Sequence, residues 1–404
     1  MRLIVEVNGM HYLRGENMGD VRKNNRTRFL EIMFKYGPVS RSEISEISGL
    51  TPPTVTALAN ELLSEGLVEE FGIDTGNRAL GRKRIQLSLV KNSRLVIGVE
   101  IGVKQILAGL VNLSGEMLIK RSVMITFKEP DTVIRQTIDL IRDIVKECQD
   151  KKVIGIGIGA TGLVDSDAGV VRNSPNLEWR NIQLRELLER EIAIPVVVDN
   201  NVRLMALGEN TFLNHWSEVS GLILIHAGYG IGCGIILNGQ LYCGNSFSAG
   251  EFGHTVIMPN GILCSCGKHG CLETLASGRA MTSAYRQKKS LEDLEYSKIM
   301  EKLLKNAENG EQGAVDILSE AGTYMGYGIN NLISLFAPDS IILHGSLFHS
   351  EIYTTPVMKL IQENHYGNSE RITIKQSQVD DELVILGAGA LALQRFLICK
   401  IVTG

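Results

Sequence analysis

The sequence predicts a two-lobed α/β protein that is preceded by a small winged helix-turn-helix module. Residues 21–90 contain three short helical patterns followed by two strand-like runs, which is the order of elements in a winged helix-turn-helix. From about residue 94, strand-like and helical stretches alternate, as they do in two α/β lobes around a cleft. The length of 404 residues also favours more than one domain.

The first two helices of the module are predicted from their ends. The first has apolar residues at helical spacing and stops at Gly37. Ser40 and Glu43 form a capping box that opens the second, in which Ile44 and Ile47 should face the core.

The third helix should begin at Thr51, with Pro52 in its first turn. Its apolar stripe leaves Thr54, Thr56 and Asn60 on the outer face. Hydroxyl and amide side chains on such a face suit base edges in a major groove, so we expect DNA contacts from these three residues.

A basic loop follows, between strands expected at residues 67–71 and 85–89. It carries Arg82, Lys83 and Arg84, which suit phosphates or a narrow minor groove. A second basic cluster spans residues 22–28. The alternative interpretation is a three-helix packing module with a solvated basic face.

Beyond the module, the pattern of apolar residues predicts the elements of the two lobes. Strands are expected at residues 95–101, 106–112, 153–158, 196–199, 222–226, 235–237, 341–344 and 372–377. Helices are expected at residues 132–149, 184–191, 204–211, 278–306 and 314–336.

The composition is that of an ordinary globular protein. With 44% hydrophobic and 21% charged residues, it excludes disordered, collagen-like and low-complexity chains. The formal net charge of −4 argues against a generally basic nucleic-acid coat, but not against one small basic module. Seven cysteines in a large chain indicate a reducing compartment. No run of 18 apolar residues and no signal peptide occur, so we expect a cytoplasmic protein.

One cluster of residue types has the composition of a metal site. His254, Cys264, Cys266 and Cys271 offer one imidazole and three thiolates, the closed tetrahedral ligand set of a structural Zn²⁺ ion. Four protein ligands leave no open position for catalysis, so the metal would hold a loop in shape. The alternative is a chance group of reduced cysteines.

Two carboxylates are tethered to this loop. Glu251 lies three residues before His254, and Glu273 lies two residues after Cys271. Paired acceptors near an imidazole suit the vicinal hydroxyls of a sugar, with one His254 nitrogen on the metal and the other towards the ligand. From spacing alone, two merely solvated glutamates remain equally compatible.

Two glycine-rich segments are ambiguous. Residues 157–162 match the dinucleotide-binding fingerprint, but the following residues predict a strand end and a turn where that fingerprint requires a helix. We therefore interpret the match as accidental. Residues 228–234 could wrap a phosphate or form a tight hairpin.

The pattern as a whole resembles the ROK family of repressors, open reading frames and kinases, over nearly the full chain. Residues 250–254 and 264–273 resemble the family's signature, and residues 174–177 with Trp179 resemble its sugar-side loop. Residues 22–26, 40–43, 49–51, 66–68 and 81–83 resemble the operator-binding domain of its repressor branch.

The resemblance implies an actin-like, hexokinase-like pair of lobes and a homodimer or homotetramer. It places an N-terminal segment at 1–20, the winged helix-turn-helix at 21–90, the first lobe at 91–210 with 386–404, and the second lobe at 211–385. It adds Arg41 and Thr51 to the expected DNA contacts. The sugar contacts that it implies, with Asn201 as a further hydrogen-bonding position, are Asn176, Asn200, Asn201, Glu251, His254 and Glu273.

The departures from the kinase pattern decide between functions. Kinase members carry an Asn-Asp pair eight residues before a Glu, and here the base position before Glu209 is Asn201, whose amide cannot take a proton. Asp199 is out of register by two residues. The phosphate side departs at residues 100–104 and at Tyr229.

The sequence thus predicts a sugar-responsive transcriptional repressor that binds operator DNA and has no catalytic residues. An active ATP-dependent sugar kinase with a fused DNA-binding domain is the alternative. A third hypothesis is a regulator that no longer binds a ligand.

Overall fold

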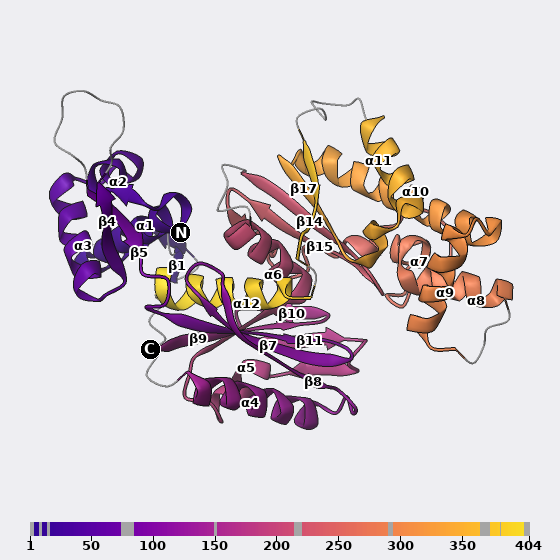
Figure 1. Cartoon of the computed structure of the whole chain (residues 1–404), viewed down its shortest axis with the longest axis horizontal. Helices are drawn as coiled ribbons and strands as arrows, with labels where there is room; N and C mark the ends of the chain where they lie inside the picture. The colour runs from indigo at the N-terminus through magenta and orange to yellow at the C-terminus, as the bar shows by residue number, and fades with distance from the viewer. Residues whose placement is uncertain are drawn as a thin grey trace.

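The computed structural model describes residues 17–73, 85–148, 152–213, 220–289, 294–363, 372–379 and 381–399. It also gives the backbone of two antiparallel strands, β1 (Ile4–Val7) and β2 (Met10–Leu13). A small module at the N-terminal end lies beside two α/β lobes (Figure 1).

The module is a winged helix-turn-helix. Its helices are α1 (Met18–Tyr36), α2 (Arg41–Ser48) and α3 (Pro52–Ser64). A three-stranded sheet has the order β3 (Val39–Ser40), β5 (Ile85–Leu89) and β4 (Val68–Ile73). The Ser40 hydroxyl accepts from the Glu43 N–H while the Glu43 carboxylate accepts from the Ser40 N–H, so the predicted capping box is present.

Two details of the module differ from the sequence prediction. Ile44 is fully buried, but Ile47 is 49% exposed, because α2 has only eight residues and presents a narrow stripe to the core. The basic cluster at the start of α1 is partly neutralised: Arg22 pairs with Glu61, and Arg26 pairs with Glu61 and Glu65 of α3. These arginines join two helices.

The first lobe is built on a five-stranded sheet. In spatial order it contains β13 (Val196–Asn200), β9 (Val153–Ala160), β6 (Leu95–Ile101), β7 (Gln105–Asn112) and β8 (Met117–Met124). Helices α4 (Pro130–Glu147) and α5 (Leu184–Glu189) cover one face, and α12 (Leu383–Leu393) lies on the other (Figure 1). A small sheet consists of β10 (Leu163–Asp165), β11 (Val170–Ser174) and β12 (Trp179–Ile182).

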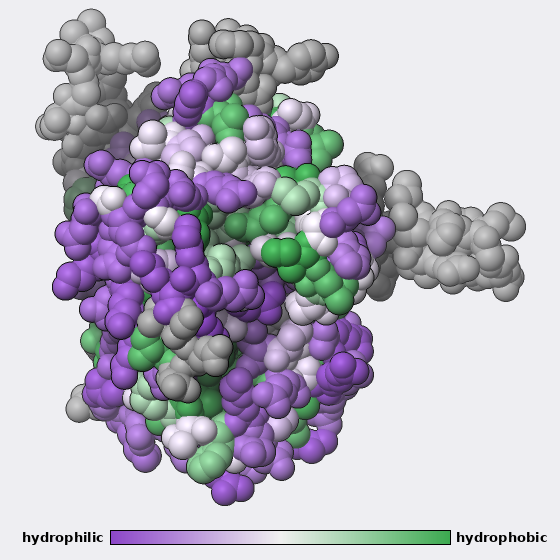
Figure 2. All heavy atoms as spheres, turned by 90° about the vertical axis from the view of Figure 1, so that its right-hand side faces the viewer, coloured by the Kyte–Doolittle hydropathy of each residue, from purple (hydrophilic) through white to green (hydrophobic). Residues whose placement is uncertain are grey.

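The second lobe has its own five-stranded sheet. Its order is β16 (Gln240–Leu241), β15 (Ile231–Leu237), β14 (Gly221–Ala227), β17 (Ser340–His344) and β18 (Thr373–Gln376). Its helices include α7 (Glu273–Ala276), α8 (Gly278–Lys289), α9 (Tyr296–Glu308), α10 (Gln312–Phe336) and α11 (Glu351–Gln362). The helix predicted at 278–306 is therefore two helices. From the side of α8 and α9 the surface is largely hydrophilic, with hydrophobic patches between (Figure 2).

Helix α6 (Asn201–Gly208) packs against both β15 and α12 and so lies where the two lobes meet. It continues into a π-helical turn, η1 (Glu209–Leu213), and α12 continues into another, η5 (Gln394–Ile398). The contact between α6 and α12 is unusually close: a Cβ on Gly387 would lie 1.7 Å from the Leu204 carbonyl oxygen.

Both glycine-rich segments have structural roles. Residue 163 begins a strand, so no helix follows residues 157–162, and a Cβ on Gly157 would lie 1.9 Å from the Ala388 carbonyl oxygen. That glycine permits α12 to approach the sheet. Residues 228–230 form the tight turn of a hairpin, with the Gly228 N–H donating to the Gly230 carbonyl over 3.0 Å.

Within the described ranges, the structure contains no helix that is both long enough and apolar enough to cross a membrane.

Candidate functional site: a cavity between the lobes

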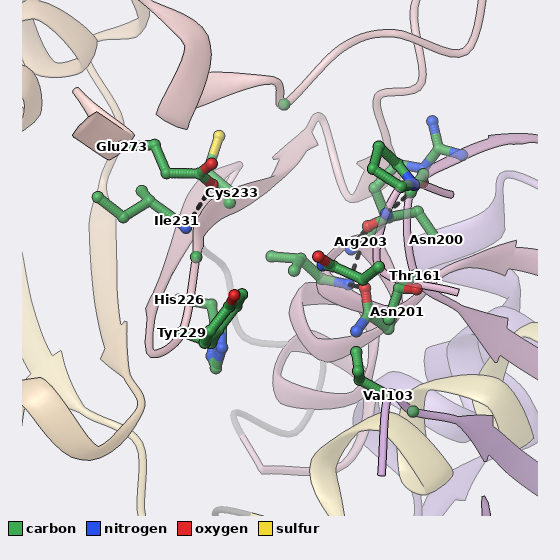
Figure 3. A pocket seen from close by; sticks show the side chains of 18 of the residues that line it. Val103, Thr161, Asn200, Asn201, Arg203, His226, Tyr229, Ile231, Cys233 and Glu273 are labelled. Atoms are coloured by element: carbon green, nitrogen blue, oxygen red, sulfur yellow. Dashed lines mark hydrogen bonds between the residues drawn. The ribbon is translucent and has the colours of Figure 1, made fainter. Parts of the chain in front are cut away.

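A cavity of about 860 Å³ lies between the two lobes. The first lobe contributes the hairpin at residues 100–107 and the start of α6, and the second contributes the β14–β15 hairpin and the loop that follows β16. Figure 3 shows side chains from both sides facing this space, with Asn201 and Thr161 opposite Ile231 and Glu273.

All the residues that the sequence analysis assigned to sugar contacts line this one cavity. They are Asn176, Asn200, Asn201, Glu251, His254 and Glu273. The structure thus brings together positions that are up to 97 residues apart in the sequence (176 to 273). The individual contacts show which of these side chains are already occupied by the protein.

Asn200 is the N-cap of α6. Its Oδ1 accepts from the N–H groups of Val202 (2.9 Å) and Arg203 (3.1 Å), and its Nδ2 donates to the Gly162 carbonyl (2.8 Å). The side chain is therefore committed to holding the helix start and shapes the wall. Asn201, the first residue of the helix, also lines the cavity.

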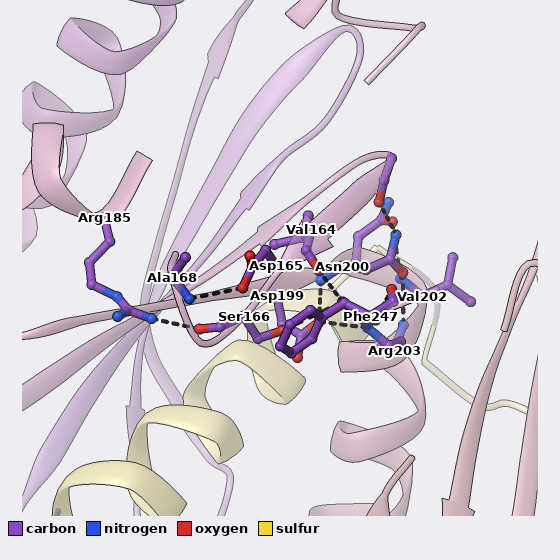
Figure 4. Close-up of polar contacts among 12 residues, drawn as sticks. Val164, Asp165, Ser166, Ala168, Arg185, Asp199, Asn200, Val202, Arg203 and Phe247 are labelled. Atoms are coloured by element: carbon purple, nitrogen blue, oxygen red, sulfur yellow. Dashed lines mark hydrogen bonds and ion pairs between the residues drawn. The ribbon is translucent and has the colours of Figure 1, made fainter. Parts of the chain in front are cut away.

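Asp199 is held away from the cavity by Arg203. Both side chains are almost fully buried and are 2.5 Å apart, and Arg203 also donates to the carbonyls of Val164 (2.8 Å) and Phe247 (2.7 Å) (Figure 4). Burial raises the pKa of Asp199, while the Arg203 charge opposes that shift. Asp199 is not among the described residues that line the cavity. It therefore does not supply the carboxylate that is missing at the position of Asn201.

Arg203 was not predicted as a site residue. Asp199 lies on strand β13 and Arg203 lies in α6, so their bond is not the i,i+4 pair of a single helix that a sequence pattern could have indicated. The bond from Arg203 to the Phe247 carbonyl, which ties the start of α6 to the loop after β16, has no local sequence signal.

Glu273 is anchored on both oxygens. Oε2 accepts from the Ile231 N–H and Oε1 from the Arg279 guanidinium, each over 3.2 Å. Glu251 is 47% exposed, and its Oε2 lies 3.8 Å from His254 Nε2. Glu251 is therefore the freer of the two acceptors.

The predicted metal ligands gather in one cluster. The ligand atoms of His254, Cys264, Cys266 and Cys271 all lie within 4.8 Å of one another. His254 Nδ1 is 3.5 Å from Cys264 Sγ, whereas its Nε2 is turned towards Glu251. One imidazole nitrogen thus belongs to the cluster and the other to the cavity side. Three sulfurs and one nitrogen are the donor set that Zn²⁺ prefers.

Two further wall residues were not assigned to ligand contacts by the sequence analysis, which named Tyr229 only as a departure from the kinase pattern. Tyr229, at the hairpin tip, meets Tyr296 edge-on with ring centroids 4.9 Å apart. His226 also lines the cavity, and its Nδ1 lies 2.8 Å from Nδ1 of His344 on the neighbouring strand. Burial, and then the charge of His344, lower the pKa of His226 to about 3, so its ring is neutral at physiological pH.

Glu100 is the other titratable wall residue with a large shift. Burial, and then the charge of Asp381, raise its pKa to about 7. Both residues lie in the wall with Lys104, on the phosphate side where the sequence departs from kinases.

The expected DNA contacts are only partly described. Asn60 and Thr56 lie on the exposed face of α3, and the Thr56 hydroxyl donates to the Pro52 carbonyl. The hydroxyls of Thr51 and Thr54 are 2.9 Å apart, and Arg41 pairs with Glu70 over 3.1 Å. Residues 82–84, which carry the basic wing, lie outside the described residues.

The fold and the cavity define a class: an actin-like, hexokinase-like two-lobed protein that carries a winged helix-turn-helix. The family model "ROK family" matches residues 96–395, and the chain belongs to the ROK family.

Relatives cover the whole arrangement. The chain is 31% identical to the xylose repressor of Caldicellulosiruptor bescii, over 93% of this chain and 97% of that protein. It is 28% identical to the transcriptional dual regulator NagC of Escherichia coli, over 94% and 95%.

The solved structures that match differ in how much of this chain they cover. A ROK family transcriptional regulator, described as a homolog of the E. coli MLC protein, matches with a TM-score of 0.78 at 27% identity, over 92% of this chain and 96% of that one. A ROK family glucokinase from Streptomyces griseus, in complex with glucose and AMPPNP, matches with a TM-score of 0.64 at 30% identity. That kinase is covered completely but covers 74% of this chain.

Proposed function

We propose that this protein is a sugar-responsive transcriptional repressor. The observation that carries the proposal is the combination, in one chain, of a winged helix-turn-helix with a cavity between two lobes, whose wall carries amide, imidazole and carboxylate side chains that suit hydroxyl groups. The xylose repressor and NagC are similar to it along nearly their whole length, which supports the same combination of roles.

The sugar is the switch in this proposal. A monosaccharide or a close relative binds between the lobes, through Asn176, Asn201, Glu251, His254 and Glu273, with Asn200 holding the start of α6. Its affinity differs between lobe arrangements, and this difference changes how the two DNA-binding modules of an oligomer are spaced. The functional unit is a homodimer or homotetramer on a pseudo-palindromic operator, and DNA as the target places the protein in the cytoplasm.

We further propose that His254, Cys264, Cys266 and Cys271 hold a structural Zn²⁺ ion. The ion would fix the loop that carries Glu251 and Glu273, and it would fix the tautomer of His254 through the bound nitrogen.

The proposal predicts that metal analysis finds about one zinc per chain. Cys266→Ser should lose the metal and the sugar response, while Cys399→Ser, which changes another exposed cysteine, should keep both. Equal zinc content in both variants would reject this ligand set.

An operator mobility-shift assay, titrated with a panel of sugars, tests the main proposal. At least one sugar should change operator affinity, by release or by tightening. Asn60→Ala and Arg82→Ala should impair DNA recognition, whereas Asn331→Ala, an exposed amide on α10, should not. No response to any sugar would reject the sensor, and normal binding by both module variants would reject the DNA surface.

The alternative of an active sugar kinase is supported by the similarity to the S. griseus glucokinase. Against it stand the amide of Asn201 at the base position and the Arg203 pairing of Asp199. ADP release with glucose, mannose, xylose and amino sugars distinguishes the two, because turnover above about 1 s⁻¹ is typical of a working enzyme.

A further inference from the structure

We propose that the cavity binds a disaccharide, or a glycoside of that length, whose second ring lies on the side chain of Tyr229. The inference rests on the proposed function and extends it, since it names the class of sugar to which the repressor responds.

The first argument is size. The cavity measures about 860 Å³, near the upper end of the roughly 300–1,000 Å³ range of small-molecule sites. A hexose displaces about six water molecules, or about 180 Å³ at about 30 Å³ each. One sugar ring therefore fills only a fraction of the space, and the rest of the wall is available to a second unit.

The second argument is the nature of that remaining wall. Tyr229 is 46% exposed although it lines a concave site, so part of its ring meets the cavity (Figure 3). An aromatic face beside polar groups fits a sugar ring, which presents C–H bonds on its faces and hydroxyls on its rim. A tyrosine supplies this contact area at low entropic cost, because it has few rotatable bonds.

The third argument is that Tyr229 is held in place before any ligand binds. Its carbonyl accepts from the Arg279 N–H over 3.1 Å, and the preceding Gly228 carbonyl accepts from the Gly278 N–H over 2.8 Å. The edge contact with Tyr296 supports one side of its ring. A fixed platform of this kind reduces the cost of ordering on binding.

The charges in the cavity wall favour a neutral ligand over a nucleotide. His226 is neutral at physiological pH and is fixed by its bond to His344, and Arg279 is paired with Glu273. Two acidic residues, Glu100 and Asp381, lie in the same wall with a single lysine among its described residues, Lys104, and a phosphate chain would add negative charge to this group. Imidazole and carboxyl groups can instead exchange hydrogen bonds with the hydroxyls of a second sugar ring.

Calorimetric titration of the full chain tests the proposal, with matched pairs of sugars: xylose and xylobiose, glucose with cellobiose and maltose, N-acetylglucosamine and its dimer. At least one disaccharide should bind at least tenfold more tightly than its own monosaccharide. Tyr229→Ala should weaken that disaccharide about tenfold and leave the monosaccharide unchanged, while Tyr229→Phe should retain most of the affinity.

Tyr327→Ala is the matched control, because Tyr327 on α10 is 48% exposed and is not a cavity residue. The melting temperature of each variant reports on folding. Monosaccharides that bind as tightly as every disaccharide, or an equal effect of Tyr229→Ala on both, would overturn the inference while leaving the sugar sensor intact. Displacement of the disaccharide by a non-hydrolysable ATP analogue would also overturn it. Failure of all sugars to bind would reject the proposed function itself.

Discussion

At the scale of single residues, the carboxyl groups around the cavity have different environments. Glu273 is held by two donors, Glu251 is open to solvent beside His254, and Asp199 is paired with a buried arginine. Glu100 differs from all three, because burial and a neighbouring acid oppose its charge. The same functional group therefore serves as an anchored acceptor, a free acceptor, a structural ion pair and, in Glu100, a carboxyl whose pKa lies near neutrality.

Glu100 predicts a pH dependence of stability. Its pKa is raised from 4.5 to about 7, so between these values the folded chain binds its proton more tightly than the unfolded chain does. The stabilisation of the folded state that this tighter proton binding contributes is complete below pH about 4.5 and is lost as the pH rises through about 7. Relative to the wild type, Glu100→Gln should therefore gain about 1–3 kcal/mol of stability between pH 5 and pH 8.

Urea unfolding between pH 5 and 8 measures this effect. Glu69→Gln, which alters an exposed glutamate on β4, is the control and should follow the wild-type curve. If the stabilities of Glu100→Gln and the wild type change in parallel with pH, the raised pKa of Glu100 is contradicted.

Sequence motifs located the cavity residues but not their bonding. Glu251, His254 and Glu273 were found because a short signature contains them, and the cluster of His254 with three cysteines follows from residue type and spacing. The bond from Asn200 Nδ2 to the Gly162 carbonyl, and the bond from Arg203 to the Phe247 carbonyl, join residues about 40 positions apart in the sequence. No local pattern carries such information.

At the scale of elements, glycines allow α12 to pack closely between the first sheet and α6. Gly98 and Gly157 allow the sheet to approach the helix backbone, and Gly387 allows contact with α6. Gly389, two residues after Gly387 in α12, does not share this role, because a Cβ there would meet Val96 at an ordinary 3.4 Å.

This difference predicts opposite effects of one substitution. Gly387→Ala should destabilise the protein by about 2–3 kcal/mol, because the new methyl group would overlap a backbone carbonyl and push two helices apart. Gly389→Ala should be neutral or stabilising by up to about 1 kcal/mol, since alanine favours helix. Thermal and urea unfolding of the pair give the result, and equal stabilities would show that α12 is not tightly seated on α6.

Elements with strong periodicity were predicted well, and short or interrupted ones were not. The expected strand at residues 95–101 matches β6 end for end, because five of its seven residues form an uninterrupted buried run. Strand β3 has two residues and no period to detect, and α11 contains Pro356, which disguises a helix. The division between α8 and α9 was missed because apolar spacing continues on both sides.

At the scale of the whole molecule, α12 connects the cavity with the DNA-binding module. It begins two residues after Asp381 of the cavity wall, packs on α6, and continues as η5 towards the module (Figure 1). There the Thr27 hydroxyl of α1 donates to the Ile398 carbonyl over 2.9 Å, between residues 371 positions apart. Buried side chains of the module and of this lobe form one continuous core cluster, so a shift of α12 reaches α1 through packed contacts.

This connection predicts that sugar response and DNA affinity can be separated. Thr27→Val removes one hydrogen bond at the junction and preserves shape, so operator affinity without sugar should stay near the wild-type value. The effect of the sugar on operator affinity should fall two- to tenfold, the equivalent of about 0.5–1.5 kcal/mol for one hydrogen bond. Because coupling is reciprocal, the effect of operator DNA on sugar affinity should fall by the same factor. Thr323→Val is the control, since its hydroxyl bonds only within α10. If the sugar response is equal in Thr27→Val and Thr323→Val, the signal reaches the N-terminal module through another contact between this module and the first lobe.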